Sequence, residues 1–240
     1  MSRTALLTLL PKSESTGVIG LDGNECPLPT QEQVAELFSH PGELVGAKVA
    51  QGFDGLELTP LATPISLLME QLKAAIFKEA TEGRMYQTRR SPSDPGIPVR
   101  ISSEKQVWIW ESLKRALDTD EPVHFPHEDS SHHRGQTKLE ARNKPHICAV
   151  PGGSMGWVES LPNLPQPGRG KTLGGGRQLE IGSSPREFLQ TLETQPYEGE
   201  TGKTLENIIA SFLTRLETTN ERSHDRHDDS ALWLLGHYVP

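Results

Sequence analysis

The stretch 63-TPISLLMEQLKAAIFKEATEG-83 carries the strongest secondary-structure signal in the chain. Thr63 and Pro64 form a helix start, with Thr63 expected as the N-cap and Pro64 as the first helical residue, and Gly83 offers a stop. Between them, apolar residues recur at the three- and four-residue spacing of one helical face: Ile65, Leu68, Leu72, Ala75, Ile76 and Ala80. The stretch predicts an amphipathic helix over residues 64–81.

A second long amphipathic helix is expected near the end of the chain, over residues 205–218. Its apolar face would contain Leu205, Ile208, Ile209, Phe212, Leu213 and Leu216. Three shorter helices are expected after the N-caps Thr30, Ser103 and Ser184, the last with Pro185 in its first turn, and a single helical turn is expected at 138–142.

Short apolar or alternating segments between these helices predict strands. They are 4–10, 17–30 (a strand and a turn), a hairpin of 44–50 with 55–60, 97–101, 146–150, a further strand within 151–160, 177–181, and a buried final strand at 231–239. The pattern predicts an α+β or mixed α/β fold in which two longer helices pack on a mixed sheet of short strands, with long Pro/Gly-rich loops. We expect residues 1–240 to form a single domain, with 118–146 as the alternative place for a subdivision.

The composition favours a soluble protein. The net charge of −8 argues against a general affinity of the whole surface for polyanions, although a local basic patch is compatible with it. No apolar run approaches the ~20 residues of a membrane-spanning helix, so no membrane contact is expected. Cys26 and Cys148 lie far apart and no secretory segment is recognised, which predicts reduced thiols and a cytoplasmic location, with a single disulfide as the alternative.

The loop 165-PQPGRGKTLGGGR-177 raises the question of phosphate binding. A Walker A loop needs glycine where Pro165 stands, and a dinucleotide-binding fingerprint needs glycine where Leu173 stands, so both motifs are excluded. What remains is a generic anion site, in which glycine lets backbone N–H groups approach an anion and basic side chains supply charge. Its predicted residues are Gly168, Arg169, Gly170, Lys171 and Arg177, and the alternative is a solvent-exposed connector.

Histidine clusters in the segment 124–146. Five of the nine histidines of the chain lie there: His124, His127, His132, His133 and His146. The run 127-HEDSSHH-133 is not the HExxH metal motif, because its second histidine comes one residue late, and no cysteine pair accompanies it. A divalent-metal site at His127, His132 and His133 is one interpretation, and a solvated polar loop is the other. No cofactor besides such a metal is predicted.

Three further patterns are weaker. The segment 224-HDRHDD-229 is a second metal candidate, but charge runs of this kind usually serve only to solvate a loop. Cys148 beside His146 suggests an activated thiol, with the amides of Gly152 and Gly153 as an oxyanion hole, but a small buried thiol on an apolar strand explains it as well. A metal-nuclease core starting at Asp94 lacks the required acid-x-Lys spacing.

No family motif is present with all its residues, so the function rests on these patterns alone. They predict a binding or assembly protein of a soluble cytoplasmic complex, with a protein partner and with nucleic acid or another polyanion at the basic loops 84–90 and 168–177. The alternative is a metal-dependent hydrolase of the phosphodiester type that uses the His-rich loop 124–146. Whether the protein is an enzyme, and its oligomeric state, are left open.

Overall fold

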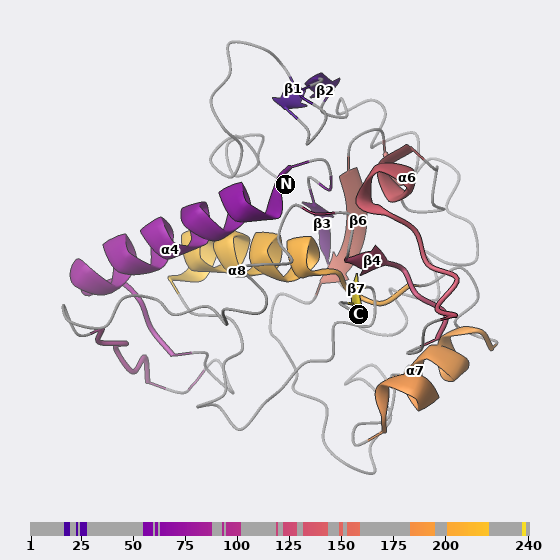
Figure 1. Cartoon of the computed structure of the whole chain (residues 1–240). Coiled ribbons are helices and arrows are strands. Elements are labelled where there is room, and N and C mark those ends of the chain that lie inside the picture. The colour runs from indigo at the N-terminus through magenta and orange to yellow at the C-terminus, as the bar shows by residue number, and fades with distance from the viewer. Residues whose placement is uncertain are drawn as a thin grey trace.

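The computed structural model contains both helices and strands, in agreement with the mixed α and β class (Figure 1). The residues that it describes are 17–19, 23, 25–27, 55–59, 61, 63–87, 93, 95–101, 119, 122–128, 132–143, 149–150, 153–158, 183–194, 201–220 and 237–238. In chain order the elements are β1 (Gly17–Ile19), β2 (Glu25–Pro27), β3 (Gly55–Thr59), α4 (Ile65–Thr81), β4 (Val123–His124), α6 (Lys138–Asn143), β5 (Ala149–Val150), β6 (Gly153–Val158), α7 (Pro185–Leu192), α8 (Leu205–Thr219) and β7 (His237–Tyr238).

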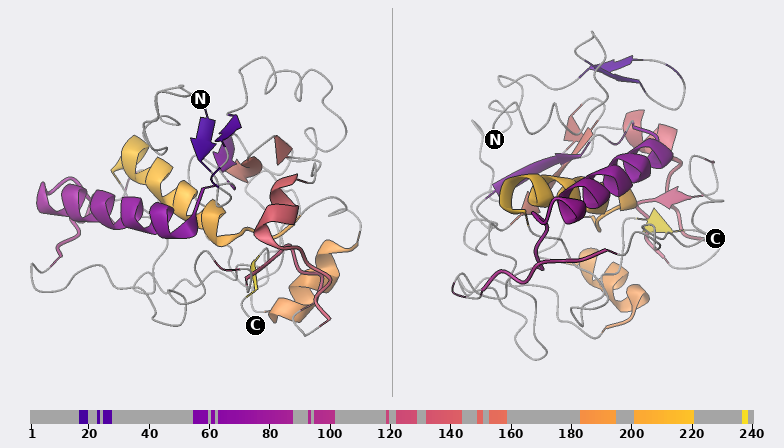
Figure 2. Two further views of the ribbon diagram at one scale, coloured as in Figure 1. Left: turned by 45° about the horizontal axis from the view of Figure 1, so that its top comes forward. Right: turned by 90° about the vertical axis from the view of Figure 1, so that its left-hand side faces the viewer.

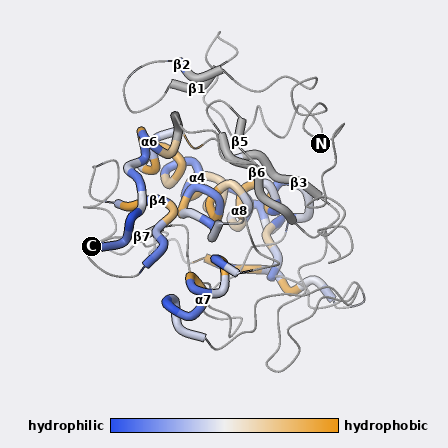
Figure 3. The backbone as a smooth tube through the Cα atoms, turned by 90° about the vertical axis from the view of Figure 1, so that its right-hand side faces the viewer, coloured by the Kyte–Doolittle hydropathy of each residue, from blue (hydrophilic) through white to orange (hydrophobic). Residues whose placement is uncertain are grey.

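The two long helices α4 and α8 pack side by side and run in the same direction (Figures 1 and 2). Near their starts, one apolar cluster joins Ile65, Leu68 and Met69 of α4 to Leu205, Ile209 and Leu213 of α8. Near their ends, a second cluster joins Ala80 of α4 to Leu216 of α8 and to Met85. Hydrophobic and hydrophilic stretches alternate along both helices (Figure 3), as the sequence periodicity predicts.

Helix α4 confirms the predicted span but not its predicted cap. The N-cap is Pro64, and no side chain caps it. Thr63 is fully buried, and its carbonyl oxygen accepts a hydrogen bond from Lys138 Nζ at 2.6 Å. Thr63 is therefore built into a tertiary contact instead of the helix start. The predicted stop is confirmed, because Gly83 adopts a left-handed φ of 69° immediately after the C-cap residue.

Helices α7 and α8 each begin with a capping box. In α7, Ser184 caps as predicted and Glu187 hydrogen-bonds back to the Ser184 amide. In α8, Thr204 and Asn207 do the same. The single helical turn expected at 138–142 is confirmed as α6.

The described strands form three small sheets, and every pairing among them is antiparallel. Strand β6 pairs with β3 on one side and with β5 on the other, so the strand predicted within 151–160 is confirmed. The mixed sheet expected from the sequence is not found among the described strands. The expected partner of β3, residues 44–50, lies outside the described residues, whereas β6 comes from almost one hundred positions further along the chain.

The predicted strand at 97–101 is wrong. The segment makes an isolated bridge between Pro98 and Tyr86 and otherwise has no regular structure. The hydrogen bonds of this bridge run from Gln87 N to Ile97 O and from Val99 N to Met85 O, and Pro98, which has no N–H, cannot donate to a strand on its other side. Val99 and Ile101 nevertheless pack against the second apolar cluster.

Several predicted elements lie outside the described residues: the strands at 4–10 and 177–181, the helices after Thr30 and Ser103, and most of 231–239, of which β7 pairs with β4. None of the described helices combines the length and apolar character needed to cross a lipid bilayer.

Candidate functional site

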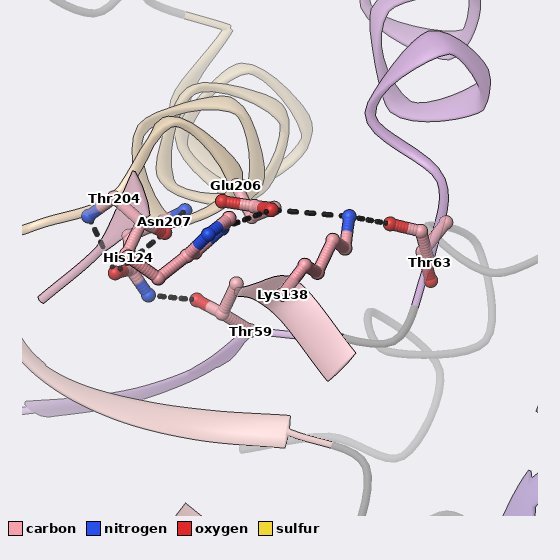
Figure 4. A network of polar contacts seen from close by, with 7 residues as sticks. All are labelled: Thr59, Thr63, His124, Lys138, Thr204, Glu206 and Asn207. Carbon is pink, nitrogen blue, oxygen red and sulfur yellow. Dashed lines mark hydrogen bonds and ion pairs between the residues drawn. The ribbon is translucent and has the colours of Figure 1, made fainter. Parts of the chain in front are cut away.

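A buried carboxylate, Glu206, is the centre of a polar network that joins several elements (Figure 4). Its Oε1 atom lies 3.0 Å from His124 Nε2 and 3.1 Å from Lys138 Nζ. Glu206 is in the first turn of α8, His124 is in β4 and Lys138 begins α6. One oxygen atom of α8 therefore joins this helix to two elements that lie 68 and 82 positions earlier in the chain.

Hydrogen bonds extend this network to the segment between β3 and α4. Lys138 Nζ also donates to the Thr63 carbonyl, and Asn207 Nδ2 donates to Thr59 Oγ1 at 2.7 Å. Asn207 Oδ1 meanwhile accepts from the backbone N–H of Thr204 at 2.9 Å, so the same side chain caps α8 and fixes the helix to β3. The start of α8 is thus held by short polar contacts from two directions.

The network is closed to solvent. His124 and Glu206 are 1% and 0% exposed, and Lys138 is 6% exposed. Burial of a lone charge costs several kcal/mol, but here the ammonium and the carboxylate compensate each other. In this arrangement the side chains of Glu206 and His124 are closed to solvent and contact one another, and the network holds α8, β4 and α6 together.

Sequence reasoning singled out His124 but missed Glu206, Lys138 and Asn207. A signal for Glu206 was present, because at ~100° per residue its position falls between Leu213 and Ala210, on the side of α8 that is buried. A carboxylate on the apolar face of a strongly amphipathic helix needs a buried partner. The identity of that partner was not in the sequence pattern, since Lys138 is 68 positions away.

A second polar cluster lies on the surface, where the loop 126–135 meets the end of α7. The loop closes through backbone hydrogen bonds of His124 with Gln136 and from His127 N to His133 O. Glu193, the C-cap residue of α7, lies 3.4 Å from His127 Nδ1 and 3.7 Å from Arg134 Nη2. The described parts of this polar segment, 126–128 and 132–135, therefore lie side by side and contact the end of α7.

The predicted metal ligands take part in this surface cluster in different ways. His127 faces Glu193, His133 Nδ1 accepts a hydrogen bond from the Gly135 amide at 3.0 Å, and His132 is exposed. Within the part of the chain that the structure describes, no three His, Cys, Asp or Glu side chains are grouped as metal ligands. Asp129 and His146 lie outside that part.

The predicted anion site falls on 168–177, and this range lies outside the described residues, as do Arg89, Arg90 and Cys148. Arg84, the first cation of the basic loop 84–90, is described. Its guanidinium pairs with Glu79 at 2.8 Å and also with Glu82. The hydrogen bonds from Arg84 hold the pKa of the Glu79 carboxyl below its usual range. Arg84 is therefore already paired with two carboxylates at the end of α4.

Comparison with known proteins adds no assignment: no family model matches the chain, and neither a curated protein nor a solved structure shows significant similarity to it.

Proposed function

We propose that the chain is a binding or assembly protein of a soluble cytoplasmic complex, and that it acts through a contact surface on α4. The observation that supports this proposal is a group of large apolar side chains at the surface. Leu67 and Phe77 of α4 are 37% and 57% exposed, and Ile97 is 53% exposed. Single exposed apolar residues are ordinary, but Leu67 and Phe77 lie on one face of one helix.

The buried network also supports the proposal, because it weighs against the alternative of a catalytic role. Its acid, base and ammonium groups resemble a catalytic set, yet they are sealed from solvent and occupied with one another. Catalysis needs such groups within hydrogen-bond reach of a substrate. The described residues therefore favour binding over catalysis.

The test compares the size of the protein in extract with its size when purified. We tag the protein and express it in its native cells. If it is an assembly protein, it should elute from a sizing column of fresh extract at a larger apparent mass than the purified chain. In the same extract, the variant Leu67→Glu/Phe77→Glu should show a much smaller increase in apparent mass than the wild type does. The reason is that two charges replace the apolar contact. Elution at the position of a single 26.5 kDa chain, both in extract and when purified, would reject the proposal.

A polyanion contact is proposed for the basic loops 168–177 and 84–90, on the sequence evidence alone. Because Arg84 is paired with Glu79 and Glu82, Arg89 and Arg90 would supply the charge of the second loop. The variant Arg169→Ala/Lys171→Ala/Arg177→Ala should bind nucleic acid more weakly and with a flatter salt dependence, by about one unit of slope per lost phosphate contact. Equal, weak binding of single- and double-stranded probes by both proteins would reject this contact.

The metal-dependent hydrolase is the second candidate function. It is supported by the backbone hydrogen bond from His127 N to His133 O and by His127 Nδ1, which lies 3.4 Å from Glu193 Oε1. If the loop holds a metal, purified protein should contain one equivalent of a divalent ion that is lost in His132→Ala/His133→Ala. Wild-type protein that is free of metal after purification in the presence of zinc or manganese would exclude this candidate.

A further inference from the structure

The exposed residues of α4 lie in a regular pattern on one side of the helix. At ~100° per residue, six side chains fall within about 100° of arc, opposite the face that packs on α8. All six are exposed: Leu67, Glu70, Ala74, Phe77, Lys78 and Thr81. Figures 1 and 2 show no other described element over this side of the helix. The face is about four turns long, with a small residue, Ala74, at its centre.

The charges on this face are symmetric about Ala74. Glu70 lies four positions before Ala74 and Lys78 lies four positions after it, and their side chains are 69% and 64% exposed. If a second α4 lies antiparallel across the first with the two-fold axis at Ala74, Glu70 of each helix faces Lys78 of the other. The same axis places both copies of Ala74 in contact, which lets the helix axes approach, and brings Phe77 over the partner helix.

We propose that the partner of this face is a second copy of the chain, bound through an antiparallel, two-fold α4–α4 contact. This inference rests on the proposed function and names its partner. A self-complementary pattern is what a two-fold interface requires, since each side must present the surface that the other recognises. An unrelated partner would not require equal spacing of opposite charges about a small residue.

The competing contacts of the two charges do not oppose this pairing. Glu70 is 2.5 Å from Lys73 on its own helix, and Lys78 is 3.9 Å from Glu79. Exposed ion pairs of this kind contribute little, so exchanging them for pairs across the interface costs little. A single helix pair buries less than the ~1,200 Å² of a typical stable complex, so the dimer should be weak.

The experiment is sedimentation of the purified full-length chain from about 5 to 500 µM, the range in which a weak dimer dissociates and forms. We expect the mass to rise with concentration toward twice the 26.5 kDa of one chain. Glu70→Lys should raise the dissociation constant about tenfold, because two like-charged contacts replace two opposite ones, and Lys78→Glu should do the same. The double variant Glu70→Lys/Lys78→Glu should restore dimerisation. Circular dichroism of each variant verifies that it is folded.

The matched control is Glu217→Lys, which makes the same charge change on the exposed end of α8 and should leave the dissociation constant unchanged. A wild-type chain that stays monomeric throughout the concentration range would overturn the inference. So would a double variant that is as weak as the single variants. If the purified chain is monomeric but elutes with a larger mass from cell extract, this inference fails while the proposed function stands.

Discussion

The protein contains two versions of one arrangement, a carboxylate oxygen shared by a histidine and a basic side chain, in opposite surroundings. In the core, Glu206 Oε1 contacts His124 and Lys138 at 3.0 and 3.1 Å. At the surface, Glu193 Oε1 faces His127 and Arg134 at 3.4 and 3.7 Å. The first carboxylate is fully buried and the side chain of the second is 50% exposed. The difference shows what burial does to such a set of charges. At the surface the contacts contribute little to stability, whereas in the core the loss of one charge leaves the other buried and uncompensated.

The largest expected effect is that of Glu206→Gln. The amide keeps the volume but removes the charge, and Lys138 is left as an uncompensated buried ammonium. We expect the free energy of unfolding to fall by about 3–5 kcal/mol. Urea denaturation measures it. Glu193→Gln is the matched control and should cost no more than about 0.5 kcal/mol. Equal effects at the two positions would contradict the comparison.

The second prediction concerns coupling within each cluster. Lys138→Met removes the buried ammonium, so Glu206→Gln/Lys138→Met leaves neither charge alone and should be more stable than the sum of the single changes by about 2 kcal/mol or more. The corresponding surface cycle, Glu193→Gln with Arg134→Ala, should show a coupling energy below about 0.5 kcal/mol. Additive losses in the core would mean that Lys138 and Glu206 are not a charge pair.

The third prediction tests the turn that joins the two clusters. Gly135 lies between Arg134 and the bridge of Gln136 to His124, and a Cβ there would lie 2.2 Å from Val123 Cγ1 and 2.9 Å from the His124 carbonyl oxygen. Gly135→Ala should therefore displace β4 and lower the free energy of unfolding by about 1–3 kcal/mol. Gly96→Ala is the control, because its Cβ would meet the side chain of Tyr86 at 3.1 Å at an exposed position. A harmless Gly135→Ala would show that β4 can shift freely.

The same contrast explains what the sequence could predict. Helices α4, α7 and α8 were predictable because their apolar spacing, their prolines and most of their caps are local signals. Thr63 was wrongly expected to cap α4 because its role depends on Lys138, which is distant in sequence. The partner of β3 could not be identified for the same reason, since register between remote strands leaves no local pattern. The buried site was predictable only as His124, one member of a histidine cluster.

The smallest expected effect is a pH dependence at the capping box of α7, the helix that carries Glu193 at its end. The backbone N–H of Ser184 donates to Glu187 Oε2 at 2.7 Å, and this hydrogen bond, with that of the Ser184 hydroxyl, lowers the pKa of Glu187. A carboxyl with a lowered pKa in the folded state stabilises the fold above its unfolded pKa of about 4.3, and this stabilisation is lost as the pH falls through the folded value. Wild type should therefore be slightly more stable than Glu187→Gln at pH 7, and the difference should shrink as the pH falls below the unfolded pKa and through the lowered pKa of the folded state. Hydrogen exchange of the α7 amides measures this locally. A difference that is independent of pH would show that the carboxylate charge contributes nothing to the cap, and that α7 depends on packing through the buried Leu189.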